Sequence, residues 1–441
     1  MRVSIRRRAT AGAGAALALT LLAACSGGAA SEPQPSTDAS ESGSPSATAP
    51  ELGGTLALAT TSDIGPKLFI DDFTAETGVD VKGTYAEAGA LGEQLRIQIT
   101  SGTAPDLFRS APGYAAPSSV LNLASEGALM DLSDQPWAQY VPESFSRLQQ
   151  LDGKTYAFPT YGQAILAFYN KDVFEEVGVE PPTTWSEFIE VLDELKAAGK
   201  VPISLGLADN YVIQFLPYAL SATLVNGQEP DFYEKLEAGE TTFAESEGWR
   251  QTFEQFLGLI EDGYTTPNPL GMPGDPAMQA VGSGEAAIVV MPSAASPVLA
   301  GFMAGGAESM GSFAVPATDD ADETHIPFTP DYLVVNADAK NADAALAFLD
   351  FISAPERTAQ WAAEVGAIPA LTNAEPIDNP LNRTVQPFLD EGRTTPFANH
   401  GWPGGQVATA LMEVGQQAVE GSKSVDDLLA ALDSAYQEAM K

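Results

Sequence analysis

Residues 172–207 read DVFEEVGVEPPTTWSEFIEVLDELKAAGKVPISLGL, and they carry the clearest local structure in the chain. Thr184 is a good helix N-cap, and Glu187 three residues later completes the pattern of a capping box. Gly199 ends the predicted helix, and the apolar run 201–207 predicts a strand directly after it. The predicted inward face of the helix consists of Trp185, Phe188, Ile189, Leu192 and Leu195.

The same alternation of helix and strand is found at the start of the folded part. The stretch GGTLALATTSD (53–63) predicts a strand, Gly78 ends a short helical pattern, and VDVKG (79–83) predicts a second strand. Such a unit pairs its strands in parallel, so the predicted fold class is α/β. Loops after the carboxyl ends of parallel strands meet ligands, which makes Ser62 and Asp63 candidates; capping of the next helix is an equally good interpretation.

Further helical faces are expected around 249–260, 346–352 and 425–436. Between them, KTYAFPTYGQAILAFYN (154–170) reads as two extended segments interrupted by Pro159 and Gly162. Proline and glycine in such a place suit a crossing between two domains.

The first 24 residues read as a signal peptide, with four arginines before an apolar run that is too short to span a bilayer comfortably. Leu22-Ala23-Ala24-Cys25 fits a bacterial lipobox, and Cys25 is the only cysteine in the chain. We therefore expect lipidation at Cys25, the alternative being an ordinary secretory signal with a stray cysteine. Residues 25–50 would form a disordered linker, because 26–50 contain no Val, Ile, Leu, Met or aromatic residue.

Charge narrows the range of partners. Removing the four arginines of the signal peptide leaves 17 basic against 59 acidic residues, a formal charge of −42. No nucleic acid is expected as a partner. Such acidity favours cationic ligands, but it also suits a solvated surface that aids solubility.

The motifs of common enzyme classes are missing from the sequence. There is no G-x-S-x-G elbow and no phosphate-binding glycine loop, so no cofactor is expected. His325 and His400 lack the spacing of metal ligands, so no metal site is expected either. Paired carboxylates could hydrolyse glycosides, yet with 59 acidic residues no pair stands out.

Four blocks in the right order resemble the extracellular solute-binding proteins of ABC importers, the group that includes maltose-binding protein. They are FYNKDVFEEVGVEPPTTWSEF (168–188), SGEAAIVVMPS (283–293), the block 331–370 from DYLVVNADAKN to VGAIPA, and the tail from HGWPGGQVATALMEV (400–414) to SVDDLLAALDSAY (424–436). This resemblance implies a two-lobed periplasmic-binding-protein-like fold whose hinge is crossed several times. We expect one lobe at 51–160 and 326–369, and the other at 161–325 and 370–441.

The resemblance also implies a function without catalysis. The expected protein is a monomer on the extracellular face of the bacterial cell membrane, held there only by its lipid anchor. It would deliver a small solute, a mono- or oligosaccharide, to the permease subunits of an ABC transporter. The alternatives are another small solute such as a polyamine, or a secreted carbohydrate-processing enzyme.

Candidate ligand-binding residues follow from the matching positions. Sugar-binding relatives carry an aromatic residue where this chain has Met291-Pro292-Ser293-Ala294, so we expect Trp402 and Tyr211 to replace that ring. Trp402 lies in the glycine-rich stretch ANHGWPGG and is expected at an exposed rim. The expected ligand-binding set is Ser62, Asp63, Arg109, Ser110, Tyr161, Asn210, Tyr211, Asp331, Tyr332 and Trp402. Ordinary alternatives are a surface ion pair for Arg109, core packing for Tyr211 and Trp402, and hinge packing for Tyr161.

Replacing Cys25→Ser tests the lipobox. The variant should lose its lipid and enter the medium, because two or three acyl chains hold a protein on a membrane far more firmly than none. Fractionation after a high-salt wash measures this, and solute binding should be unchanged. Retention of the variant on the membrane would contradict the lipobox.

Overall fold

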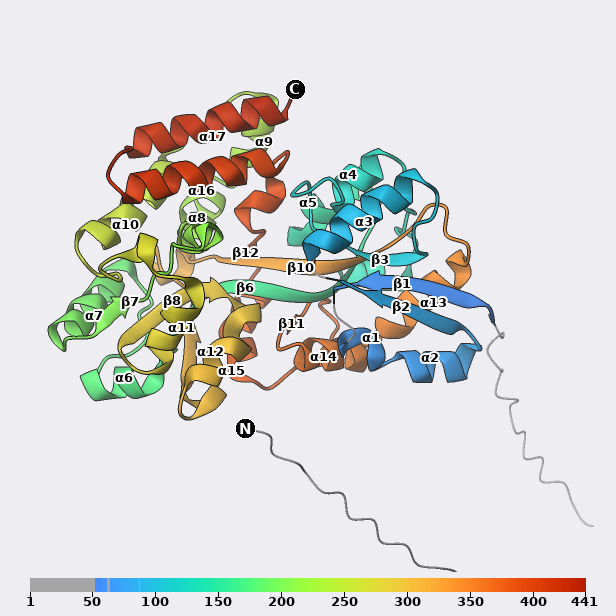
Figure 1. Cartoon of the computed structure of the whole chain (residues 1–441), viewed down its shortest axis with the longest axis horizontal. Helices are drawn as coiled ribbons and strands as arrows, with labels where there is room; N and C mark the ends of the chain where they lie inside the picture. Colours follow the sequence, from blue (N-terminus) through green and yellow to red (C-terminus); the bar gives the residue numbers. More distant parts are fainter. Residues whose placement is uncertain (1–51, 62–63, 87) are drawn as a thin grey trace, which may run out of the picture. The chain divides into compact units, whose positions relative to one another are not determined.

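The computed structural model describes residues 52–61, 64–86 and 88–441. The predicted signal peptide, Cys25, the linker, and the candidates Ser62 and Asp63 lie outside these residues. The described residues belong to one compact unit, 49–441. Within it, Figure 1 shows two lobes of helices and strands, joined by the long strands β6 (Phe158–Asn170) and β10 (Ile326–Val335).

The first lobe contains the early part of the unit and a later stretch of the chain that comes back to this lobe. Its strands are β1 (Thr55–Thr60), β2 (Asp80–Tyr85) and β3 (Leu107–Ser110), with the hairpin β4 (Gln150–Leu151) and β5 (Lys154–Thr155). Its helices are α1 (Ile64–Lys67), α2 (Ile70–Thr77), α3 (Ala88–Thr100), α4 (Val120–Ser125), α5 (Ser146–Gln149), α13 (Ala342–Ile352) and α14 (Pro355–Glu364).

The second lobe is larger and richer in helices. Its strands are β7 (Val201–Ile203), β8 (Ala286–Pro292) and β9 (Met310–Phe313). Its helices are α6 (Lys171–Val177), α7 (Trp185–Ala197), α8 (Phe215–Ser221), α9 (Phe232–Ala238), α10 (Glu247–Glu261), α11 (Gly274–Gly282), α12 (Ser296–Phe302), α15 (Pro380–Asp390), α16 (Gly405–Val419) and α17 (Val425–Ala439).

Short strands and short helical segments make up the remaining secondary structure of the described residues. The strands β11 (Ile368–Pro369) and β12 (Thr394–Thr395) pair with β6 and β10 respectively. The short helical segments are η1 (Pro136–Tyr140), η2 (Glu143–Phe145), η3 (Asn210–Gln214), the π-helical η4 (Ala222–Gly227), η5 (Pro269–Gly271), η6 (Ser293–Ala295), η7 (Gly306–Ser309), η8 (Ala321–Glu323) and η9 (Ala398–Gly401).

The two lobes share one sheet through the crossing strands. Its main path runs β2-β1-β3-β10-β6-β8-β7. Strand β10 pairs antiparallel with β3 of the first lobe and with β6, whose second half pairs with β8 and β9 of the second lobe. The predicted parallel pairing of the first two strands is confirmed, since Leu56 lies opposite Val81 in β2.

Helices cover both faces of the sheet in each lobe. In the first lobe Leu58 and Leu107 belong to one buried cluster, while their neighbours Ala59 and Phe108 belong to another on the opposite face. Strand β6 alternates in the same way between two clusters of the second lobe. A sheet buried on both faces is the layer arrangement of an α/β protein, as predicted. The lobe limits expected from the sequence stay a prediction.

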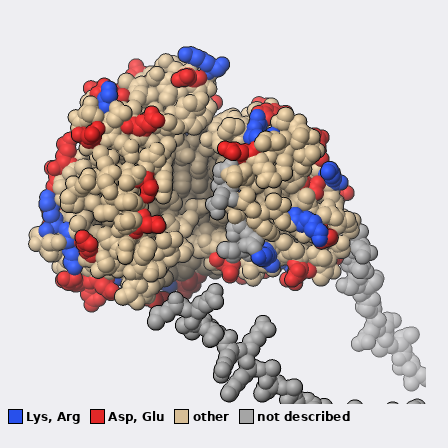
Figure 2. Space-filling view, viewed as in Figure 1, with Lys and Arg blue, Asp and Glu red and all other residues tan. Residues whose placement is uncertain are grey.

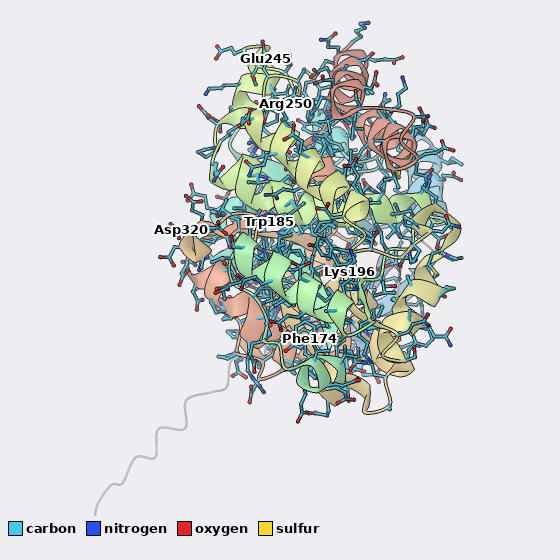
Figure 3. The ribbon with its side chains drawn as sticks, turned by 90° about the vertical axis from the view of Figure 1, so that its left-hand side faces the viewer. Phe174, Trp185, Lys196, Glu245, Arg250 and Asp320 are labelled. Atoms are coloured by element: carbon cyan, nitrogen blue, oxygen red, sulfur yellow. The ribbon has the colours of Figure 1, made fainter. Side chains whose placement is uncertain are left out.

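Helix α7 forms as its sequence predicts. Thr184 Oγ1 accepts a hydrogen bond from the Glu187 N–H at 3.2 Å, and the Glu187 carboxylate accepts one from the Thr184 N–H. Phe188, Leu192 and Leu195 are buried in the second lobe. In Figure 3, Trp185 lies near the start of this helix and Lys196 near its end. The lysine ammonium donates a hydrogen bond to the Asp262 carbonyl at 2.6 Å.

Residues 158–170 differ from the expectation of two interrupted segments. They form the single strand β6, and Gly162 stays within it because the Phe328 ring of β10 occupies the place of a side chain there. A Cβ atom on Gly162 would lie 1.9 Å from the Phe328 ring. The glycine therefore permits close packing in the crossing rather than ending a strand.

The expectation that Trp402 is exposed is wrong. Its side chain is fully buried, with its ring centroid 5.9 Å from that of Tyr218 and 6.0 Å from that of Phe243. Glycine and proline do place it in a loop, after η9. That loop lies directly over the core of the second lobe, and the side chain fills the core. Core packing, the alternative considered for Trp402, is what the structure shows.

The variant Trp402→Ala should therefore destabilise the fold. Removing a fully buried indole leaves a cavity, and we expect the free energy of unfolding to fall by about 3–5 kcal/mol. Urea denaturation followed by circular dichroism measures this. The control Tyr211→Ala changes a side chain that is 52% exposed and should cost no more than about 0.5 kcal/mol. An unchanged denaturation midpoint for Trp402→Ala would contradict the core assignment.

Candidate functional site

A row of polar side chains crosses the sheet where the two lobes join. Tyr161 of β6 lies opposite Asp331 of β10, and Gln163 of β6 lies opposite Thr329 of β10. Arg109 of β3 lies opposite Leu333, two residues beyond Asp331. Because side chains of cross-strand partners and of alternate residues share one face, these five polar residues lie on the same face. The pairing of β10 with β6 shifts register between Asp331 and Tyr332, within this row of polar residues.

Arg109 and Asp331 form an ion pair at the centre of this row. The guanidinium Nε and Nη2 atoms both lie 2.8 Å from Asp331 Oδ1. The side chains are 22% and 10% exposed, so the pair is only partly screened by water. The Asp331 carboxylate raises the pKa of Arg109, although burial opposes this. The guanidinium of Arg109 therefore keeps its charge, and two of its N–H groups point at one oxygen of Asp331.

Tyr161 lies beside this ion pair. Burial, and then the charge of Asp331, raise the pKa of its phenol, so the hydroxyl keeps its proton. Its ring packs against Trp361 with a centroid distance of 6.5 Å. The residue combines a fixed ring with a polar tip.

His400 of η9 contacts this row of polar residues from the side of the second lobe. Its Nδ1 lies 2.8 Å from Thr329 Oγ1, and burial together with the nearby Arg109 charge lowers the pKa of the imidazole to about 3. The ring is therefore neutral near pH 7. The His400 carbonyl accepts a hydrogen bond from the Tyr114 N–H, and a Cβ atom on Gly113 would lie 1.9 Å from that oxygen. With its positive φ of 57°, Gly113 is the residue type that this close approach needs.

A pocket of about 380 Å³ lies next to Gln163 in the second lobe. It is bounded by Tyr211 of η3, Phe215 of α8 and the end of β8. In the stretch 291–294, where the chain lacks an aromatic residue, Ala294 contributes only a small side chain to the pocket wall. Ser293 is buried, and its Oγ accepts a hydrogen bond from the Ala164 N–H. The other lining residues are Gly206, Val212, Gly274, Ala277, Met278, Val289, Val290, Met291, Pro292 and Ala295. Figure 2 shows a groove between the two lobes.

The structure brings together only part of the expected set. Arg109, Tyr161 and Asp331 lie side by side, and Tyr211 lines the pocket. Asn210 is exposed beside Tyr211 but does not line the pocket. Ser110 and Tyr332 are buried on the opposite face of the sheet. Their expected place in the site is wrong because each is one residue away from a site residue, and successive strand residues point to opposite faces.

Three residues of the site were missed in the sequence, namely Gln163, Thr329 and His400. Alternation along β6 could have found Gln163, since it lies two residues beyond the candidate Tyr161. Thr329 likewise lies two residues before Asp331. His400 has no local signal, because its contact with Thr329 depends on how a distant loop packs.

Other kinds of site find little support in the described part of the chain. There, no group of three or more His, Cys, Asp or Glu residues is arranged to hold a metal ion. A helix of the length and apolar character needed to cross a membrane is also absent from the described residues.

The low pKa of His400 predicts a stability that depends on pH. Between pH 6.5 and about 3 the unfolded chain takes up a proton on this ring and the folded chain does not, so stability falls as the pH falls. At pH 5 the loss relative to pH 7 should be about 2 kcal/mol. Urea denaturation at both pH values measures it. His400→Gln should flatten this dependence, whereas His325→Gln, at the only other histidine, should keep it. Equal pH dependence in both variants would contradict the assignment.

Comparison with solved structures identifies the fold. The chain is similar to a chitin oligosaccharide binding protein, with a TM-score of 0.73, 21% identity, and coverage of 88% of this chain and 99% of that one. It is similar to RafE from Streptococcus pneumoniae to the same TM-score, 0.73, with 20% identity over 88% of this chain and 99% of that one. These likenesses concern the fold, and they confirm the predicted two-lobed α/β architecture.

Comparison of sequences gives the family. The chain is 28% identical over 203 residues to the "Probable sugar-binding periplasmic protein" of Mesorhizobium japonicum. That match covers 45% of this chain and 46% of the relative, so the chain spans a little under half of it. The pattern of bacterial extracellular solute-binding proteins matches residues 59–359. Since this is more than half of the chain, the protein belongs to the family of bacterial extracellular solute-binding proteins.

Proposed function

We propose that this protein binds a mono- or oligosaccharide between its lobes and delivers it to an ABC transporter permease without altering it. The protein would be a monomer, tethered outside the cell through lipid on Cys25. Arg109, Tyr161, Gln163 and Asp331 would form the polar floor of the sugar site, and Tyr211 its aromatic wall.

The observation that carries this proposal is an exposed aromatic ring beside a row of polar groups. A sugar ring has an apolar C–H face and a rim of hydroxyls, so its site needs a flat ring and several donors and acceptors. Tyr211 is 52% exposed and lines the same pocket as Gln163. Tyr161 lies two residues before Gln163, and opposite Tyr161 the Arg109–Asp331 pair offers fixed donors and acceptors for hydroxyls.

The position of the site suits a protein that closes on its ligand. The polar floor lies on the crossing strands β6 and β10 and, through Arg109, on β3 of the first lobe, while the pocket wall belongs to the second lobe. A solute that contacts both would stabilise the arrangement in which the lobes lie closest. Lobe closure of this kind is a shift between two states that the ligand favours unequally.

Other observations favour binding over catalysis. Hydrolysis of a glycoside uses two carboxyl groups on either side of the bond. Among the described residues that line the pocket, none is Asp or Glu, and the nearby Asp331 is paired with Arg109. The same features disfavour a polyamine as the solute of this site. Among similar proteins, RafE is described in a complex with raffinose.

A thermal-shift screen of sugars, followed by calorimetry, tests the proposal. A sugar at about a hundred times its dissociation constant should add about 2.7 kcal/mol to native stability. For the sugar found, Tyr211→Ala and Gln163→Ala should each weaken binding by about 1–3 kcal/mol, or roughly five- to 150-fold, because each removes a contact in a partly desolvated pocket.

Tyr140→Ala is the matched control, since Tyr140 is also an exposed tyrosine but lies in η1, outside the pocket. Its sugar affinity should equal that of the unchanged protein. Loss of affinity in the control alone would place the site elsewhere. Release of product from glycosides would replace the binding role with an enzymatic one.

A further inference from the structure

The pocket next to Gln163 differs in chemistry from the polar floor beside it. Among its described lining residues, only Gln163 and Tyr211 carry a nitrogen or oxygen atom in the side chain. A sugar ring placed wholly inside it would leave most of its hydroxyls without a side-chain partner, which is unfavourable. The hydroxyls therefore belong on the floor of Arg109, Tyr161 and Asp331, and the pocket remains for an apolar part of the ligand.

Several apolar side chains in the pocket wall are incompletely buried. Val212 of η3, Phe215 of α8 and Met278 of α11 pack against the core clusters of the second lobe, yet each keeps part of its surface accessible. Ala294 of η6 is exposed. Apolar surface from four elements thus meets in one hollow. Such a surface favours an apolar group that displaces water from it.

The shape and chemistry of the wall suit an aromatic ring. The rings of Tyr211 and Phe215 lie edge to face, with centroids 5.9 Å apart and planes at 68°. Met278 and Met291 add two thioethers to the wall, and sulfur of this kind packs well against aromatic rings. The pocket holds about 380 Å³, whereas an apolar cavity of about 150 Å³ is enough to hold benzene. One aromatic ring therefore has both room and partners here.

Negative charge lies beside this pocket. Asp209 Oδ2 accepts a hydrogen bond from the Gly274 N–H at 2.8 Å, and a Cβ atom on Gly274 would lie 3.3 Å from that oxygen and 3.9 Å from the Tyr211 hydroxyl. Burial, and then the charges of Asp209 and Asp275, raise the pKa of Tyr211. An anionic group on the ligand would be repelled here, so the aromatic group should be uncharged.

We propose that the solute is an aryl glycoside, a sugar whose uncharged aromatic substituent occupies this pocket while its hydroxyls lie on the polar floor. The inference rests on the proposed sugar-binding function and names the substrate class of that same site. Tyr211 is exposed and lines the pocket, so its ring contacts both the sugar and the substituent.

Titration calorimetry with matched pairs of ligands tests this. The pairs are the methyl and phenyl glycosides, in both anomers, of glucose, galactose, mannose and xylose. In at least one pair the phenyl glycoside should bind about ten- to 100-fold more tightly, because its ring leaves water as a buried Phe side chain does. Its heat-capacity change on binding should also be more negative. Phenol alone should bind far more weakly than the phenyl glycoside.

Two variants change the pocket wall itself. Ala294→Phe places a ring in the pocket, and Met278→Gln keeps the side-chain length but adds a polar amide. Both should lower the ratio of phenyl to methyl affinity, Ala294→Phe to about one. The matched controls are Ala198→Phe and Met440→Gln, at exposed residues outside the pocket, and they should keep the ratio of the unchanged protein. Thermal melting should show that all four variants fold.

The outcomes separate this inference from the function on which it rests. Equal affinities within every pair that binds would overturn the aryl glycoside and leave the sugar-binding function standing. Tighter binding of N-acetylglucosamine than of glucose, without a gain from phenyl, would assign the pocket to an acetamido group instead. A ratio that falls equally in the controls, or a panel in which no glycoside binds, would also overturn the inference. Phenol bound as tightly as the phenyl glycosides, with no methyl glycoside bound, would contradict the sugar-binding function itself.

Discussion

The antiparallel pairing of β6 with β10 is the constraint on which this structure depends. These two strands carry the main sheet from one lobe to the other, and their backbone ladder includes Gln163 opposite Thr329 and Tyr161 opposite Asp331. The packing of Phe328 against Gly162 sets how closely they approach. Since the polar row is built on this ladder, its side chains are positioned by backbone hydrogen bonds rather than by flexible loops. Arg109 then ties β3 of the first lobe to the same row.

The fold could largely be predicted because its signals are local. The capping box of α7, the glycine that ends α2 and the apolar faces of the long helices depend only on neighbours in sequence. The break expected at Gly162 was wrong for a physical reason. From the local sequence, a glycine indicates a point where the chain can turn. Here, however, the space that a side chain of Gly162 would occupy is filled by the Phe328 ring, from a strand more than 160 residues away.

The site was harder to predict than the fold. Positions along one strand can be found from alternation, so Tyr161 and Asp331 imply Gln163 and Thr329 once the strands are known. Alternation along a strand gives no help for Trp402, because this residue lies in a loop. Loop composition correctly indicates the absence of a helix at that point, but exposure depends on what the loop covers, and here it covers the core of the larger lobe. Burial of Ser110 and Tyr332 likewise follows from the face of the sheet, which sequence proximity to a site residue does not give.

The hydrogen bond from the Tyr114 N–H to the His400 carbonyl joins a loop that follows β3 to one that packs on the second lobe. Any separation of the lobes at this point would exchange that bond for water. A backbone hydrogen bond contributes about 1 kcal/mol net, which corresponds to a roughly fivefold change in an equilibrium constant. Under the lobe closure proposed above, this one contact would favour the arrangement in which the lobes lie closest before any solute arrives. The apparent solute affinity scales with the fraction of molecules that are already in the competent arrangement.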